Sequence, residues 1–169
     1  MHRKLSYIAL IVLFASCLHS QNNVPKAAAD DPVNINAKVD RADVISYAKK
    51  YLGTTYHYAG NDPKGFDCSG FVNFVFKNFN IEVPRSSGEY KSLGIALKPG
   101  EFKVGDILVF YGYRDHTSIG HVGIICEADG MNSKFIHSSS GKAYGVTISE
   151  LGSEMYSRRF YKCIDVIHE

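Results

Sequence analysis

The chain has 169 residues, 45% of them hydrophobic and 21% charged, so it can form one domain with a hydrophobic core but not two domains of ordinary size. The formal net charge is +2, and the first 16 residues contribute two cations, Arg3 and Lys4, and no acid. The rest of the chain is neutral overall and lacks the basic excess with which proteins bind phosphates, so we expect no nucleic-acid partner.

Residues 1–20 have the pattern of a bacterial secretion signal, in which a basic start precedes an apolar run and then small residues. The apolar run, Ile8 to Ala15, is too short for a comfortable transmembrane helix, and a retained membrane anchor is the alternative. Residues 14–17, Phe-Ala-Ser-Cys, are similar to a lipobox, where a lipoprotein is cleaved and the new N-terminal cysteine is acylated. We therefore expect lipidation at Cys17, with ordinary cleavage near Ser20 as the alternative.

Residues 21–39 are polar and small and have no period, which predicts a flexible tether ahead of a domain over residues 40–169. Asp40 is a suitable N-cap for a helix over 41–52, which Gly53 would end. The apolar residues expected on the buried face of this helix are Val44, Ile45, Ala48, Tyr51 and Leu52.

Residues 54–66 are rich in turn-forming residues and predict a loop. A second helix is expected to begin at Cys68, with Asp67 as its N-cap, and its apolar residues, from Phe71 to Phe79, predict that it is largely buried. Farther along, Ser86-x-x-Glu89 is a capping-box pattern that predicts a short helix.

From Phe102 onward the sequence consists of short runs rich in β-branched and aromatic residues, separated by turn signals such as Asp129-Gly130. The predicted strands lie within residues 105–111, 121–128, 134–140, 145–151 and 158–167. Helices followed by strands predict an α+β domain in which the N-terminal helices, including the one that starts at Cys68, pack on a central antiparallel sheet.

Cys68 has four possible roles: a buried packing residue, half of a disulfide, a metal ligand or a nucleophile. Its place at a helix N-terminus favours reactivity, because the unpaired N–H groups and the positive end of the helix dipole stabilise a thiolate. Cys126 and Cys163 each lie in a strand-like apolar run, and we expect both to be buried free thiols, with a bridge between them as the alternative.

A base for Cys68 could come from His121 or His137, which lie in two predicted strands joined across the Asp129-Gly130 turn. If these strands are neighbours, both imidazoles can point toward one end of the helix, and one would accept the proton while the other orients it. Zinc bound by the cysteine and both histidines is the competing interpretation. The chain has no closely spaced pair of ligands, so we expect no metal and no other cofactor.

Two more histidines lie outside this arrangement. His116 is in a loop before His121 and is expected to be solvated, and His57 could line a cleft beside Tyr56.

Several separated motifs occur in a familiar order: GTTYHYAGNDPKGFDCSGFV, VPRSSGEY, FKVGDILVF, GHVGIICEADGMNSKFIHSSS and GVTIS. Together they resemble the NlpC/P60 family of papain-like cysteine peptidases, over about Arg41 to Val166, and the short lipoprotein layout is most similar to Spr-type murein endopeptidases. The resemblance implies a papain-like NlpC/P60 fold and a hydrolase that cleaves peptide stems of bacterial peptidoglycan.

By this resemblance Cys68 matches the nucleophile, His121 the general base and His137 the polar residue that orients the base. Tyr56 matches the tyrosine whose hydroxyl helps the Cys68 backbone N–H to hold the oxyanion. The positions that match substrate-binding segments are Asp67, Ser69, Arg85, Ser86 and Ser87. The chain departs from the family in its longer loop, YGYRDHTSIG, before His121.

The resemblance also leads us to expect peptidoglycan stem peptides as the partner. From the secretion signal we expect an exported protein, held to a membrane by its lipid and facing the periplasm or the cell surface, and we expect a monomer. The bond cut would be γ-D-glutamyl–diaminopimelate or D-alanyl–diaminopimelate. The alternatives are an amidase or acyltransferase with the same Cys–His machinery, or a non-catalytic lipoprotein that binds the wall.

Overall fold

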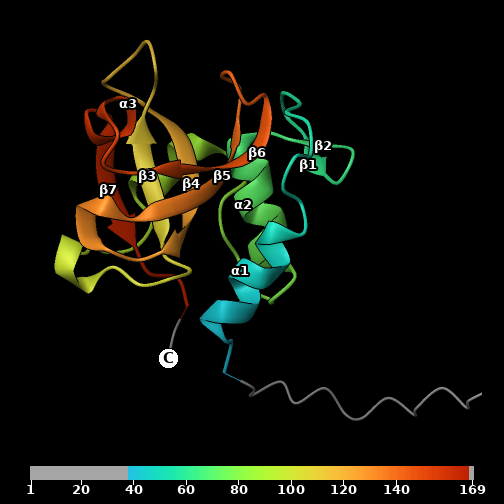
Figure 1. Ribbon diagram of the computed structural model, residues 1–169, viewed down its shortest axis with the longest axis horizontal. Helices are drawn as coiled ribbons and strands as arrows, with labels where there is room; N and C mark the ends of the chain where they lie inside the picture. The colour runs from blue at the N-terminus through green and yellow to red at the C-terminus, as the bar shows by residue number, and fades with distance from the viewer. Residues whose placement is uncertain (1–37, 168–169) are drawn as a thin grey trace, which may run out of the picture. The chain divides into compact units, whose positions relative to one another are not determined.

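The computed structural model describes residues 38–167 (Figure 1). The predicted signal, the lipidation site Cys17 and nearly all of the predicted tether lie outside the described residues. Within residues 38–167, no helix has both the length and the apolar character needed to cross a membrane.

The first helix, α1 (Arg41–Lys49), begins where the sequence predicts, because the Asp40 carboxylate accepts the Ala42 N–H at 2.7 Å. It ends at Lys49 rather than at residue 52, and Gly53 closes the following turn at a φ of 82°. In that turn the N–H of Leu52 bonds to the carbonyl of Lys49, three residues back, which is a tighter winding than the α-helix. The prediction that Leu52 lies on the buried face is wrong: its side chain is 45% exposed.

The second helix, α2 (Cys68–Lys77), starts at Cys68 as predicted, with the Asp67 carboxylate accepting the Gly70 N–H at 2.6 Å. Phe71, Val72, Val75 and Phe76 are fully buried, which confirms the expected core helix. Gly70 is required here, because a Cβ at this position would lie 2.1 Å from the carbonyl oxygen of Gly60 in the preceding loop.

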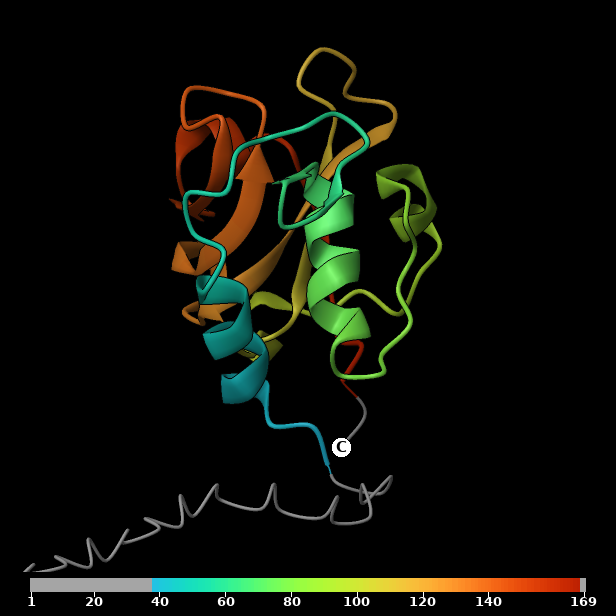
Figure 2. The same ribbon diagram turned by 90° about the vertical axis from the view of Figure 1, so that its right-hand side faces the viewer.

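The five predicted strands are all present and form one antiparallel sheet in the order β6-β5-β4-β3-β7. Their bounds are β3 (Ile107–Tyr111), β4 (Ile119–Glu127), β5 (Lys134–Ser139), β6 (Gly145–Glu150) and β7 (Phe160–Ile164). Helix α2 packs against β4 and β5, and Figures 1 and 2 show α1 and α2 beside the same face of the sheet. The α+β prediction is therefore confirmed.

Smaller elements complete the domain. The hairpin β1 (Asn61–Asp62) and β2 (Gly65–Phe66) and the short helix α3 (Glu154–Ser157) were not expected from the sequence. The predicted capping box is present in a 3-10 helix, Ser87–Lys91, where the Ser86 N–H donates to the Glu89 carboxylate at 3.2 Å. Two further 3-10 turns are Pro99–Glu101 and Gly130–Asn132.

The sheet separates two hydrophobic clusters. One contains the buried residues of α1 and α2 together with Val122, Ile124 and Ile136, and the other contains Phe110, Ile125, Phe135 and Tyr156. Alternate residues of β4 therefore face opposite cores, as the twofold side-chain period of a strand requires.

The cysteines follow this division. Cys126 of β4 belongs to the cluster on the helix side, and Cys163 of β7 belongs to the other cluster. Both are buried free thiols, as expected, and a bridge between them does not form because they lie on opposite faces of the sheet.

Candidate active site

Helix α2 places Cys68 against the first part of strand β4. Cys68 is the first residue of the helix and is half-buried. Backbone N–H groups of Val122, Ser69 and Cys68 itself act on the sulfur and favour its charged form. Val122 follows His121 directly in β4, so the backbone N–H that acts on the Cys68 sulfur belongs to the residue next to His121.

Strands β4 and β5 bring the two predicted histidines together. Nε2 of His121 lies 3.0 Å from Nδ1 of His137, and the rings meet edge to face with their centroids 4.8 Å apart. Gly123 makes this possible, since a Cβ there would lie 2.6 Å from the Phe135 ring and 3.0 Å from Cβ of His137. Both imidazoles contact aromatic rings of the core opposite α2, including Tyr156.

The far side of His137 has partners that the sequence did not reveal. Its Nε2 lies 3.0 Å from the hydroxyl of Ser149 and 3.3 Å from that of Tyr156. Ser149 lies in β6, where its register partner is Phe135, and Tyr156 lies in α3. Ser149 could have been found only by fixing the register between the predicted strands 134–140 and 145–151, and no pattern marks Tyr156.

These contacts link His121, His137 and Ser149 in a row, along which each group can donate a hydrogen bond to the next. If Nδ1 of His121 is to accept a proton, its Nε2 must carry one and donate it to Nδ1 of His137. His137 then carries its own proton on Nε2 and donates to Ser149. In this arrangement each imidazole holds the tautomer of the other.

Burial favours the neutral forms of all three groups. It lowers the pKa of His121 well below its usual value and lowers the pKa of His137 to about 4. Burial, and then the charge of Asp67, raise the pKa of the Cys68 thiol. These shifts favour a neutral thiol and neutral imidazoles at rest, with the helix dipole and the backbone N–H groups opposing part of the shift of Cys68.

Tyr56 lies in the loop between α1 and β1, where it forms an isolated parallel bridge with Phe66, two residues before Cys68. Its N–H donates to the carbonyl of Tyr144 at 3.0 Å, and the two rings are 5.7 Å apart. Burial, and then electrostatic interaction with Cys68, raise the pKa of the Tyr56 phenol, so the hydroxyl remains a hydrogen-bond donor at neutral pH.

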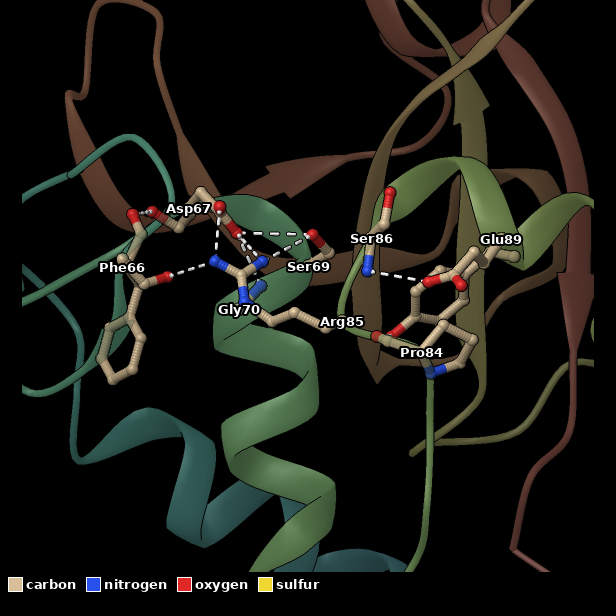
Figure 3. A network of polar contacts seen from close by, with 11 residues as sticks. Phe66, Asp67, Ser69, Gly70, Pro84, Arg85, Ser86 and Glu89 are labelled. Atoms are coloured by element: carbon tan, nitrogen blue, oxygen red, sulfur yellow. Dashed lines mark hydrogen bonds and ion pairs between the residues drawn. The ribbon is translucent and has the colours of Figure 1, made fainter.

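Asp67, Ser69 and Arg85 form one polar network at the start of α2 (Figure 3). Arg85 donates to both carboxylate oxygens of Asp67, at 3.0 and 2.8 Å, and to the hydroxyl of Ser69 at 3.2 Å. It also donates to the Gly60 carbonyl at 3.3 Å. This bidentate ion pair joins Asp67, the residue before Cys68, to the segment after α2 that carries Arg85.

The remaining predicted residues lie apart from that network. Ser86 is exposed and belongs to the separate contact with Glu89 in Figure 3, and Ser87 opens the 3-10 helix. His116 is exposed, as expected, and so is His57. Within the described part of the chain, histidine, cysteine and acidic side chains form no group of three that could hold a metal ion.

A pocket of about 710 Å³ opens beside His121 on the side of α3. Tyr156 separates it from the buried aromatic core, and Cys68 is not among the residues that line it. The site therefore has two sides along β4: the helix N-terminus with Cys68, and this pocket, which His121 borders.

Residues 53–165 match the sequence model of the NlpC/P60 family. The chain belongs to the NlpC/P60 family. The predicted fold and family are thereby confirmed.

Individual proteins of known sequence or structure support this family assignment. The chain is 35% identical over 118 residues to a probable endopeptidase NlpC homolog of Haemophilus influenzae, a match that covers 69% of this chain and 58% of the relative. It is 29% identical to the murein DD-endopeptidase MepS/murein LD-carboxypeptidase of Escherichia coli K12, covering 94% of this chain and 88% of that protein. A crystal structure of an NlpC/P60 family protein from Bacillus cereus superimposes with a TM-score of 0.69 at 27% identity, covering 78% of this chain and 42% of the other.

The neutral resting state predicts how fast Cys68 reacts with iodoacetamide, which attacks only thiolate. Since a raised pKa leaves little thiolate at neutral pH, the rate should rise about tenfold per pH unit from pH 5 to 8. Mass spectrometry of the tryptic peptide 65–77, which contains no other cysteine, would measure this rate.

The same protein unfolded in guanidinium is the matched control, and its Cys68 should react faster than the native residue at pH 7. A native rate that stays constant between pH 5 and 7 would instead indicate a resting thiolate–imidazolium pair and contradict this account.

Proposed function

We propose that the protein is a cysteine endopeptidase that hydrolyses amide bonds in the stem peptides of peptidoglycan. The observation that carries the proposal is the 3.0 Å contact between His121 of β4 and His137 of β5, the two strands against which helix α2 packs with Cys68 at its N-terminus. The two named relatives, both described as endopeptidases, support the reaction class.

In the first step, Nδ1 of His121 takes the proton of the Cys68 thiol as the sulfur attacks the carbonyl carbon of the scissile amide. The positive charge that appears on His121 is stabilised by the neutral His137, which accepts the Nε2–H. His137 can keep this role because its pKa of about 4 leaves it unprotonated at neutral pH.

The attack creates a negative oxygen on the former carbonyl. The backbone N–H of Cys68, in the first turn of α2, and the Tyr56 hydroxyl are the proposed donors to that oxygen. The raised pKa of Tyr56 suits this role, because a phenol that stays protonated donates throughout the reaction.

His121 then returns its proton to the leaving nitrogen, the C–N bond breaks, and the amine fragment departs. The acyl group remains on Cys68 as a thioester. Water, deprotonated by His121, attacks the thioester, and the thiol is regenerated as the carboxylic acid leaves. Every proton moves through groups of the chain or water, so the cycle uses no metal or cofactor.

The proposed bond is γ-D-glutamyl–diaminopimelate or D-alanyl–diaminopimelate. The likeness to the Escherichia coli DD-endopeptidase, which extends over 94% of this chain, supports the D-alanyl crosslink. Asp67, Ser69 and Arg85, with Ser86 and Ser87 nearby, are the proposed contacts to the stem. In this role the Asp67–Arg85 pair would both hold the start of α2 and present polar groups beside Cys68.

We also propose that the protein is exported and anchored through acylated Cys17, facing the periplasm or the cell surface. The support is the secretion-signal pattern of residues 1–20 and its lipobox-like end.

Replacing the nucleophile tests the enzymatic proposal. Cys68→Ala and Cys68→Ser should reduce the release of stem fragments from purified sacculi by at least about a thousandfold, because no other group can form the thioester. Cys126→Ala, which removes a buried thiol from strand β4, should keep most of the activity. Mass spectrometry of the muropeptides identifies the bond and separates an endopeptidase from an amidase or acyltransferase.

Undiminished activity in Cys68→Ala would refute the assignment. Loss of activity in EDTA, restored by zinc, would show that a metal centre performs the reaction instead. Binding to sacculi with no turnover under reducing conditions would support the non-catalytic alternative.

The anchor is tested by fractionation. Cys17→Ala should move the protein from the membrane fraction to the soluble fraction, because the acylation site is lost while the rest of the signal remains. Ser16→Ala, which keeps a small residue before the cysteine, is the matched control and should stay in the membrane fraction. An unchanged distribution of Cys17→Ala would exclude lipidation as the anchor.

A further inference from the structure

Arg159 is a buried arginine with no acidic partner among residues 38–167. It is only 8% exposed. Its Nε donates to the carbonyl of Tyr111 at 2.9 Å, and its guanidinium carbon lies 5.7 Å from the centre of the Tyr113 ring. These contacts leave the guanidinium charge uncompensated. A buried charge of this kind costs free energy unless an opposite charge binds to it.

The guanidinium borders the pocket beside His121. Among residues 38–167, three cations line this pocket, Arg114, Lys142 and Arg159, and no aspartate or glutamate does. The volume of about 710 Å³ is sufficient for an amino-acid residue with a long side chain. A planar guanidinium binds a carboxylate through two parallel hydrogen bonds, so the pocket has the charge and the chemistry of a carboxylate site.

The position of the pocket indicates which part of a substrate enters it. In the proposed reaction, His121 gives its proton to the leaving nitrogen, so the residue that carries this nitrogen must lie on the side of His121. His121 lines the pocket and Cys68 does not. The pocket is therefore placed to receive the leaving residue, an inference that rests on the proposed function.

In both proposed bonds the leaving nitrogen belongs to diaminopimelate. This residue is lysine with a further carboxyl group on the carbon that bears the side-chain amine. We propose that Arg159 binds this carboxylate in the pocket beside His121 and so selects stems that contain diaminopimelate over stems in which the group is neutral or absent. Arg159 is thus a specificity residue on the leaving-group side.

The test uses two crosslinked stem dimers that are identical except at this group, one with the free carboxylate and one with the carboxamide on each diaminopimelate. Binding to the full-length chain carrying Cys68→Ala, measured by calorimetry, removes turnover from the comparison. The carboxylate dimer should bind about 10- to 100-fold more tightly, as expected for a charge-assisted hydrogen-bonded pair.

Variants locate the source of the preference. In Cys68→Ala with Arg159→Met the ratio should fall below about threefold, and Arg159→Lys, which keeps the charge without the planar fork, should retain part of it. Arg158→Met is the matched control: the neighbouring arginine is exposed, pairs with Glu154 and does not line the pocket, so the ratio should not change. Circular dichroism would show that each variant is folded.

Equal binding of the two dimers to Cys68→Ala would overturn the inference even if no Arg159 variant folds. A preference that persists in a folded Arg159→Met variant would also overturn it. Wild-type protein that hydrolyses both dimers at equal rates would leave the endopeptidase proposal intact and remove the role of Arg159. Carboxylate-selective binding that depends on Arg159, without any hydrolysis, would support the pocket and reject the enzymatic proposal.

Discussion

The hydrogen bond between Nε2 of His121 and Nδ1 of His137 is the constraint on which the proposed chemistry depends. It leaves Nδ1 as the ring nitrogen of His121 available to a substrate or to Cys68, and in the proposed reaction His137 must be a neutral acceptor. The surrounding structure maintains that state: burial keeps the pKa of His137 at about 4, and Ser149 provides an oxygen for its other nitrogen. Gly123 lets the two strands bring these rings into contact without a clash.

The start of α2 faces opposing electrostatic demands. Asp67 is needed as the N-cap of the helix, yet its negative charge raises the pKa of the adjacent Cys68 thiol. Arg85 offsets this charge through its bidentate contact while leaving the cap bond to Gly70 in place. The ion pair thus lets one carboxylate stabilise the helix at a smaller electrostatic cost to the nucleophile. Arg159, on the other side of His121, differs from Arg85: no acidic side chain among residues 38–167 offsets its charge, and its proposed partner is the carboxylate of the substrate.

The sequence was sufficient for features that depend on local patterns. The start of α2 at Cys68 follows from an N-cap and an apolar run, and the five strands follow from β-branched segments between turns. The pairing of His121 with His137 could be predicted because one turn joins their strands. By contrast, Ser149, Tyr156 and Arg159 acquire their roles from strand register and from the packing of a four-residue helix, which no local pattern encodes. The exposure of Leu52 was missed for a similar reason, since α1 ends at Lys49 and Leu52 lies in the tighter turn that follows it.

The most direct test of the account is the protonation state of the two histidines, measured by nitrogen-15 NMR of protein labelled at histidine, with His137→Gln used to assign the signals. At pH 7 both rings should be neutral, and both should carry their proton on Nε2, with Nδ1 of His121 unprotonated. A His137 ring protonated on Nδ1 could not accept the hydrogen bond from His121, and an imidazolium at His121 in the resting protein would mean that Cys68 has already lost its proton. Either result would contradict the account.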